Sequence, residues 1–261
     1  MKFGLSFLVL MSISFAGQLR ADMVSTITKI KPSVVIVGTF KNTNSPRFAL
    51  KGTGFVVANG NQGVSNLVIT NAHVLQQPAE ENPETLLVIQ IRVGQNELQM
   101  RSAVVLEVDK LRDLALLRFE GPSVPALKVR DSGMVQEGQA IAFMGFPIGG
   151  ALGFSPVTHR GMISSITAAA LPTPTAQQLN EKTIRGLRGG DSFNIFQLDG
   201  TAYPGNSGGP LFDPDTGEVL GVLNMVFIKG TRESALTNPS GISYAIPSAF
   251  ILQLLQRSKT N

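Results

Sequence analysis

The sequence predicts an all-β protein built from two barrels, and three observations lead to this expectation. Short apolar runs rich in β-branched residues recur between turn clusters, with no heptad stretch and no repeat of fixed period. The 261 residues include 27 Gly and 15 Pro but only 15% charged residues, which is typical of short strands and turns rather than long charged helices. A hydrophobic fraction of 43% excludes a wholly disordered chain.

The first residues predict a secretory signal peptide over residues 1–16. Lys2 precedes an apolar stretch, and Ser14 to Ala16 place small residues where signal peptidase cleaves. We expect cleavage after Ala16, with Ala21 as the later alternative. The apolar stretch is shorter than the ~20 residues of a membrane-spanning helix, which disfavours an uncleaved anchor. An exported chain without Cys indicates a bacterial periplasmic or extracellular protein, because small secreted animal domains are commonly rich in disulfides.

The mature domain is expected to cover residues 22–261 and to contain two sets of strands. The predicted strands are the apolar runs at residues 34–40, 54–57, 67–70, 86–93, 103–108, 114–119, 127–130, 140–145, 157–166, 195–198, 211–212, 219–225 and 242–246. The segment at 120–125 contains Gly and two Pro and divides these runs about equally. We therefore expect an N-terminal barrel over about 24–120 and a C-terminal barrel over about 126–247.

One helix is predicted, at residues 248–257 near the end of the chain. Ser248 is the candidate N-cap, and an apolar face follows it at the helical spacing. The residues of this face are Phe250, Ile251, Leu254 and Leu255.

Charge and composition exclude several classes of function. The formal net charge of +4 is a small excess for a protein dedicated to nucleic acids. The absence of Cys excludes disulfides, thiol catalysis and Cys-containing zinc sites. Asp213, Asp215 and Glu218 suggest calcium as an alternative, but Asp-Pro-Asp-Thr-Gly at 213–217 is what a hairpin turn needs. We expect no metal and no cofactor.

A Gly-rich turn carries the strongest candidate for catalysis. Residues 205–210 read Gly-Asn-Ser-Gly-Gly-Pro, and glycines allow the backbone angles that expose a hydroxyl and aim neighbouring amides inward. Ser207 is therefore the candidate nucleophile. A serine hydroxyl needs a base, and the chain has two His. His73 ends an apolar strand, whereas His159 lies in a polar interval, so His73 is the favoured base.

A carboxylate is needed to fix the tautomer of the base and to stabilise its cation. Asp109 and Asp113 are both eligible. Asp113 adjoins the apolar run at 114–119 and is expected to be partly buried, whereas Asp109 has charged neighbours and is expected to be exposed. Asp113 is therefore favoured, and Asp109 stays open as the alternative.

Together these segments resemble trypsin-like serine proteases of the HtrA type. The three matching segments are Thr-Asn-Ala-His-Val at 70–74, Asp-Leu-Ala-Leu-Leu at 113–117 and Gly-Asn-Ser-Gly-Gly-Pro-Leu at 205–211, in the order His, Asp, Ser of the chymotrypsin fold. The resemblance covers about residues 34–255. It implies two six-stranded antiparallel β-barrels with the active site between them and a short C-terminal helix.

The resemblance also implies a role for each candidate residue. His73 would be the general base, Asp113 its orienting carboxylate and Ser207 the nucleophile, while the backbone N–H groups of Gly205 and Ser207 would bind the oxyanion.

A specificity pocket is implied in the same way. Thr201, six residues before the nucleophile, would form its base, and Val222 and Leu223 would lie in one wall. Because none of the three supplies a carboxylate, we expect cleavage after small or medium aliphatic residues rather than after Lys or Arg. Asp199 is the nearest acid in sequence and keeps a basic preference open.

The implied function is that of an exported serine endopeptidase that hydrolyses unfolded or misfolded proteins and peptides. It needs no cofactor, metal, nucleic acid or stable membrane span after signal removal, and a homo-oligomer is compatible with it. The alternative is a binding or chaperone module on the same fold, with an inactive or loop-blocked site.

The sequence departs from related patterns at three places. Asn206 stands where trypsin-like zymogens carry Asp, and Tyr203 stands where HtrA proteins usually have a small polar residue. HtrA proteins often continue into PDZ domains, whereas we expect none after the helix of this sequence.

Overall fold

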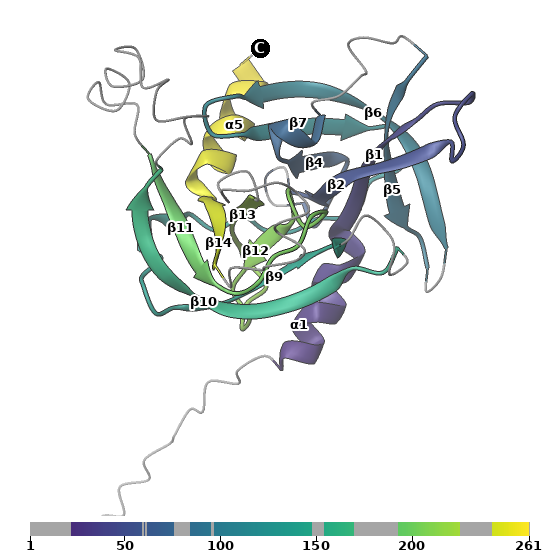
Figure 1. Cartoon of the computed structure of the whole chain (residues 1–261). Coiled ribbons are helices and arrows are strands. Elements are labelled where there is room, and N and C mark those ends of the chain that lie inside the picture. The colour runs from purple at the N-terminus through teal and green to yellow at the C-terminus, as the bar shows by residue number, and fades with distance from the viewer. Residues whose placement is uncertain are drawn as a thin grey trace, which may run out of the picture.

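Two closed antiparallel barrels of six strands each form the body of the molecule in the computed structural model (Figure 1). The structure describes residues 22–58, 60, 62–75, 84–94, 97–147, 154–169, 193–224 and 242–260. The predicted all-β class and the two-barrel architecture are confirmed. The proposed signal peptide at 1–16 lies outside the described residues.

The strands follow one another along the chain, so each barrel is built from one continuous half. The N-terminal barrel has the order β1-β2-β4-β7-β6-β5, with β1 Val34–Phe40, β2 Phe48–Val56, β4 Leu67–Thr70, β5 Leu86–Arg92, β6 Leu98–Asp109 and β7 Leu114–Phe119. The C-terminal barrel has the order β10-β11-β14-β13-β12-β9, with β9 Ala140–Gly145, β10 Val157–Ala168, β11 Asn194–Asp199, β12 Pro210–Phe212, β13 Val219–Asn224 and β14 Ile242–Pro247.

The segment between the barrels pairs with both of them, which corrects the predicted strand at 127–130. Leu127 forms an isolated parallel bridge with Val57 of the first barrel, and Val129 forms one with Val219 of the second. Just before it, the two-residue strands β3 Val64–Ser65 and β8 Val124–Pro125 form a small separate sheet. The linker is therefore fixed by short contacts to each side instead of joining one barrel.

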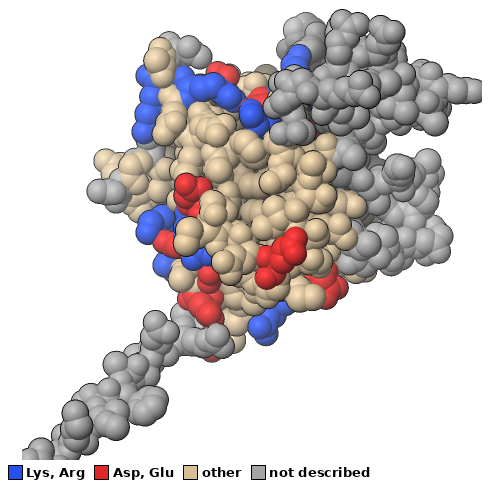
Figure 2. All heavy atoms as spheres, turned by 90° about the vertical axis from the view of Figure 1, so that its left-hand side faces the viewer, with Lys and Arg blue, Asp and Glu red and all other residues tan. Residues whose placement is uncertain are grey.

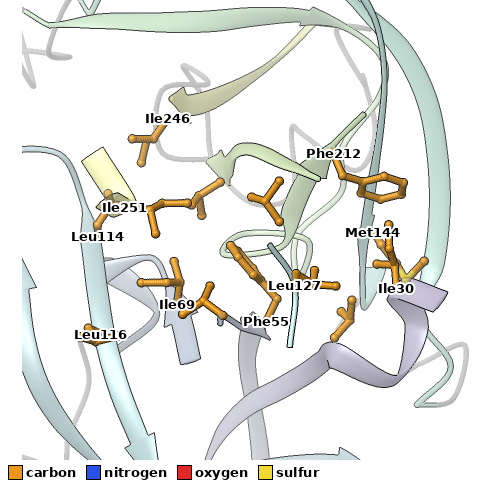
Figure 3. Packing of buried hydrophobic residues seen from close by; sticks show 14 of the residues in the cluster. Ile30, Phe55, Ile69, Leu114, Leu116, Leu127, Met144, Phe212, Ile246 and Ile251 are labelled. Atoms are coloured by element: carbon orange, nitrogen blue, oxygen red, sulfur yellow. The ribbon is translucent and has the colours of Figure 1, made fainter. Parts of the chain in front are cut away.

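The largest hydrophobic cluster lies between the barrels rather than inside either one (Figure 3). Strands of both barrels, the linker and two helices contribute side chains to it. Its labelled members are Ile30, Phe55, Ile69, Leu114, Leu116, Leu127, Met144, Phe212, Ile246 and Ile251. Each barrel also has a smaller cluster of its own. Because apolar burial is the main favourable term in folding, this shared core fixes one barrel against the other.

Strand β13 shows why a continuous apolar run is needed here. All six of its residues are buried. Val222 packs into the cluster shared by the barrels, whereas its neighbour Leu223 packs into the C-terminal barrel. Successive side chains of a strand point to opposite faces, so both faces of β13 are covered by protein.

Three α-helices complete the described chain, and the first two of them were not predicted. In α1 (Met23–Ile30), Asp22 accepts a hydrogen bond from the Val24 N–H at the N-cap, and Ile30 is fully buried. The four-residue α2 (Ala72–Leu75) carries His73. The helical sequence pattern of α1 is short, because the helix has eight residues and buries only Thr26 and Ile30, which lie one helical turn apart.

The C-terminal helix α5 (Ala249–Thr260) confirms the prediction but corrects the role of Ser248. The Ser248 hydroxyl donates to the Arg130 carbonyl at 2.5 Å, and the Ser132 hydroxyl accepts from the Ala249 N–H at 3.0 Å. The helix lies beside β6 and β7 of the N-terminal barrel (Figure 1). The end of the chain thus returns to the first barrel. The short 3₁₀ turns are η1 (Lys31–Ser33) and η2 (Ser132–Met134).

Neutral residues cover most of the described surface in the view of Figure 2, with one group of Lys and Arg along the upper edge and others near Asp and Glu at the left and lower edges. This distribution agrees with the low charged fraction of the sequence. Within the parts of the chain that the structure describes, no helix combines the length and apolar character needed to cross a membrane.

We predict that Phe55→Ala lowers the free energy of unfolding by about 3–5 kcal/mol, because it opens a cavity in the cluster that joins the barrels. Met134→Ala is the control, since Met134 is 87% exposed, and it should change stability by less than about 0.5 kcal/mol. Urea unfolding of both variants measures the difference. Equal losses in the two variants would contradict the role assigned to the shared core.

Candidate active site

His73 and Asp113 form a short hydrogen-bonded pair in the N-terminal barrel. The His73 Nδ1–H donates to Asp113 Oδ2 at 2.5 Å, and the His73 backbone N–H donates to Oδ1 at 2.7 Å. A carboxylate only accepts, so this pairing places the proton on Nδ1 and leaves Nε2 free to accept one. The side chains are 26% and 18% exposed, so the pair is partly shielded but reachable.

Several hydrogen bonds hold Asp113 in a backbone conformation that residues other than Gly rarely adopt. Its φ is +53°, the only positive φ of a non-Gly residue in the described chain. Its carbonyl accepts from the Asn71 side chain at 3.0 Å and from the Ala72 N–H at 3.1 Å. These bonds tie the turn before β7 to the segment that carries His73, and they offset the cost of the left-handed conformation.

Asn224 supplies a third contact to the carboxylate and comes from the other barrel. Its side-chain N–H donates to Asp113 Oδ2 at 2.7 Å, and Asn224 is fully buried at the end of β13. The orienting carboxylate therefore receives hydrogen bonds from both barrels.

The turn that carries Ser207 has two N–H groups without an acceptor among the described residues, and they are those of Gly205 and Ser207. The Asn206 N–H donates to the Tyr203 carbonyl, the Gly208 N–H to Leu223 and the Gly209 N–H to Asn206. Gly205 and Gly208 have φ values of +103° and +86°, which only Gly adopts readily. Because buried N–H groups are normally paired, two adjacent free donors indicate a site built for an acceptor.

The Ser207 turn rests directly on the N-terminal barrel. The Thr53 N–H donates to the Ser207 carbonyl at 2.8 Å. A Cβ at Gly52 would meet both the Val74 side chain and the Ser207 carbonyl oxygen, at 2.7 and 3.0 Å. Gly208 lies against the Thr70 hydroxyl and the Asn71 backbone, so a side chain there has no room. These contacts bring the turn against the segment that carries His73.

His159, the alternative base, lies elsewhere and has no carboxylate partner among the residues described. Its ring stacks on Phe143, with centroids 4.9 Å apart and an interplanar angle of 15°, and lies 6.3 Å from the Tyr203 ring. Its Nε2 is buried without a hydrogen-bond partner in the described structure, and burial lowers the pKa of His159 below the ordinary 6.5. His159 is thus a neutral stacked ring.

A comparison with family models matches residues 52–222 to the trypsin-like peptidase domain. The chain belongs to this family. The matched region contains His73, Asp113 and Ser207 and most of both barrels of this trypsin-like domain.

Curated relatives of this trypsin-like domain are serine proteases from two cellular settings. The mitochondrial serine protease HTRA2 of Drosophila pseudoobscura pseudoobscura is 31% identical over 216 residues, covering 83% of this chain and 41% of the relative. A probable periplasmic serine endoprotease, DegP-like, of Marinomonas sp. (strain MWYL1) is 29% identical over 211 residues, covering 80% and 36%. The chain spans less than half the length of these relatives.

Solved structures show the same fold. The HtrA-type protease AlgW with a tripeptide superimposes with a TM-score of 0.63 at 22% identity, over 90% of this chain and 62% of that one. The same protease with a decapeptide gives a TM-score of 0.66 at 20% identity, over 92% and 68%.

The residues expected in the specificity pocket of the trypsin-like domain lie in different surroundings. Thr201 is half-buried, whereas Val222 and Leu223 are fully buried in two different hydrophobic clusters. Fully buried side chains offer no surface to a substrate, so only Thr201 enters the proposal below.

The sequence reasoning assigned no role to two polar residues that touch the site. Asn224 binds Asp113, and Thr53 binds the Ser207 turn. Each residue stands out in the sequence by its position. Asn224 is the polar residue that ends the apolar run of β13, and Thr53 is a hydroxyl residue between Gly52 and Gly54. Asn206, the departure from zymogen patterns, is fully buried, and its side-chain amide has no partner within the described ranges.

Asp109, the alternative orienting carboxylate, is buried rather than exposed as expected, and it serves another purpose. Its Oδ2 accepts from Arg112 Nη1 at 2.9 Å and from Arg257 Nη2 of α5 at 3.0 Å, and its Oδ1 accepts from the Arg112 N–H at 3.1 Å. The Arg112 guanidinium lies over the Phe250 ring, 4.4 Å from its centroid. Asp109 thus connects the turn before Asp113 to the C-terminal helix.

The hydrogen bonds of Asp109 with Arg112 and Arg257 lead to a prediction about how the stability of the fold depends on pH. Burial raises the pKa of Asp109, but hydrogen bonds from Arg257 and Arg112 outweigh burial, so the pKa lies below the ordinary 3.8. A depressed pKa stabilises the fold above the unfolded pKa, and this contribution disappears as the pH falls through the folded pKa. We predict that Asp109→Asn lowers the free energy of unfolding by about 1–3 kcal/mol at neutral pH.

Denaturant unfolding at pH 7 and in steps below pH 4 checks this prediction, because the difference between wild type and variant should shrink in acid. Asp131→Asn serves as the control, since Asp131 is exposed and accepts one local bond from the Gly133 N–H. A difference that stays constant through the acid range would show that ionisation of Asp109 is not the cause.

Proposed function

We propose that the chain is a serine endopeptidase that uses Ser207 as nucleophile, His73 as general base and Asp113 as orienting carboxylate. The observation that carries the proposal is the Ser207 turn. It offers two free N–H groups beside a candidate nucleophile, and it lies against the segment whose His73 is already paired with a carboxylate. The serine protease relatives support the same activity.

The chemistry proceeds through an ester of Ser207 with the substrate. His73 Nε2 takes the proton from Ser207 Oγ as the oxygen attacks the peptide carbonyl carbon, and the N–H groups of Gly205 and Ser207 bind the resulting oxyanion. His73 then donates its proton to the leaving amine, and the C–N bond breaks. Water next attacks the ester, with His73 again as base, to release the acid and restore Ser207.

Asp113 contributes by holding His73 and by stabilising its cation. Two hydrogen bonds from His73 and one from Asn224 fix the carboxylate, so the imidazolium that forms during attack meets an oriented anion. A preorganised charge stabilises the transition state without reorganisation at the moment of reaction.

The proposed setting is export, with unfolded proteins or peptides as substrates. A periplasmic DegP-like relative and the charge and hydropathy pattern of residues 1–16 support export to a bacterial periplasm or outside the cell, although another relative is mitochondrial. The solved structures of the HtrA-type protease AlgW contain a tripeptide or a decapeptide, and we propose that this chain likewise binds peptides.

We predict that Ser207→Ala and His73→Ala each reduce peptide hydrolysis by about 10⁴-fold or more and that the double variant loses no more, because the two residues act as a unit. Asp113→Asn should cost far more activity than Asp109→Asn, since a neutral amide favours the wrong His73 tautomer. Hydrolysis of casein, together with labelling by a fluorophosphonate, measures both effects.

His159→Ala is the matched control for His73→Ala and should retain most activity. Two results would contradict the triad: additive losses in the double variant, or inactivity of His159→Ala with His73→Ala active. A wild-type chain that the fluorophosphonate does not label at Ser207 would favour a binding module on a protease fold, because only an activated serine reacts with this probe.

The next prediction concerns which residue of the substrate precedes the cleaved bond. Thr201 provides no charge, so a buried Lys or Arg of the substrate would lose hydration without gaining a partner. We expect products of an unfolded-protein digest to end in Val, Ala, Leu or Ile, and Thr201→Asp should shift cleavage toward Lys and Arg. Sequencing the products checks this. Cleavage by wild type mainly after Lys and Arg would instead implicate Asp199 as the pocket acid.

A further inference from the structure

Thr53 belongs to β2 of the N-terminal barrel, yet it makes three hydrogen bonds to the C-terminal barrel. Its hydroxyl donates to the Gly205 carbonyl at 2.6 Å and accepts from the Phe146 N–H at 3.1 Å. Its backbone N–H donates to the Ser207 carbonyl at 2.8 Å, and its own carbonyl accepts from the Thr70 hydroxyl at 2.7 Å. Thr53 is fully buried, so no water competes for these partners.

The hydroxyl acts on the peptide unit that lies between the two free donors of the Ser207 turn. The Gly205 N–H precedes that peptide and the Ser207 N–H follows it, while its carbonyl is the group that Thr53 holds. Gly205 imposes little preference on its own dihedral angles, and its φ of +103° is accessible mainly to Gly. The N–H of this peptide, that of Asn206, donates to the Tyr203 carbonyl within the turn, and the Thr53 hydroxyl supplies the hydrogen bond that holds the peptide from the other barrel.

We propose that Thr53 is a positioning residue for the oxyanion site, whose hydroxyl fixes the Gly205–Asn206 peptide and so aims the Gly205 and Ser207 N–H groups at the developing negative charge. This inference rests on the proposed serine endopeptidase activity. In this proposal the N-terminal barrel supplies the His73 and Asp113 side chains and also helps to shape the oxyanion site.

The Thr53 hydroxyl both donates and accepts a hydrogen bond, so substitutions can be distinguished by whether the new side chain can do both. Ser can do both, whereas Val has the shape of Thr but can do neither. In Thr53→Val the Gly205 carbonyl and the Phe146 N–H would both be left buried without this partner. The bond from the Thr53 backbone N–H to Ser207 does not depend on the side chain and should survive in both variants.

The test compares Thr53→Val and Thr53→Ser with wild type on a fluorogenic peptide chosen from the cleavage sites of an unfolded-protein digest. Active-site titration with a fluorophosphonate sets the concentration of competent enzyme. We expect Thr53→Val to lower kcat about 30- to 100-fold with KM changed less than about threefold, because the oxyanion forms only in the transition state. Thr53→Ser should stay within about threefold of wild type, because its hydroxyl makes both bonds.

A peptide trifluoromethyl ketone provides a second readout, because its adduct with Ser207 carries an oxyanion. Its inhibition constant should rise in Thr53→Val by about the same factor as kcat/KM falls, while the KM of the amide substrate changes little. Ser248→Ala is the matched control. It also removes a fully buried hydroxyl that donates to a backbone carbonyl, that of Arg130, and should lose stability with kcat/KM unchanged.

Several results would overturn the proposal. They are unchanged kcat and inhibition in Thr53→Val, equal losses in Thr53→Val and Thr53→Ser, and a loss confined to KM. If Thr53→Val does not fold, Thr53→Ala replaces it with the same expectation, and failure of both to fold would show a purely structural role. A wild-type chain that the fluorophosphonate does not label at Ser207 would instead contradict the proposed function.

Discussion

The hydrophobic contact between the two barrels is the constraint on which the site depends. Phe55, Ile69 and Leu114 from one barrel meet Met144, Phe212 and Ile246 from the other in one dry cluster. None of the polar groups of the site could keep its geometry without this contact, because His73 and Asp113 come from one barrel and Ser207 from the other. The polar bonds across the boundary then refine what apolar burial has brought together.

Those polar bonds run in both directions across the boundary. Thr53 reaches from the first barrel to the carbonyls of the Ser207 turn, and Asn224 reaches from the second barrel to Asp113. Each half of the candidate site is thus completed by a residue of the other half. A small rotation between the barrels would disturb the carboxylate and the Ser207 turn together, so we regard barrel docking and site assembly as one event.

Strand periodicity and turn composition were sufficient to predict the all-β class and the two barrels, whereas the pairing of His73 with Asp113 followed from the resemblance to trypsin-like serine proteases. The sequence could not reveal Thr53 or Asn224, since their roles arise only when residues 152 and 111 positions apart meet. The prediction for Asp109 was wrong for the same reason. Its charged neighbours in sequence suggested exposure, but its carboxylate is buried and accepts a hydrogen bond from Arg257 of α5, which offsets the loss of hydration. The short helix α1 has apolar residues at Met23, Ile27 and Ile30, but its eight residues are too few to show a clear helical period.

The return of α5 to the first barrel bears on the order in which the protein is completed at the ribosome. The N-terminal barrel emerges first, but the Arg257 that neutralises Asp109 is synthesised 148 residues later. Ser207 also comes later in the chain than His73 and Asp113, and its turn is hydrogen-bonded to β13. A nascent chain therefore carries His73 and Asp113 before Ser207 has been made, and the turn next to Asp113 gains its contact with Arg257 only when the last helix is complete. The candidate site is thus assembled late in synthesis, after residues from both barrels are present.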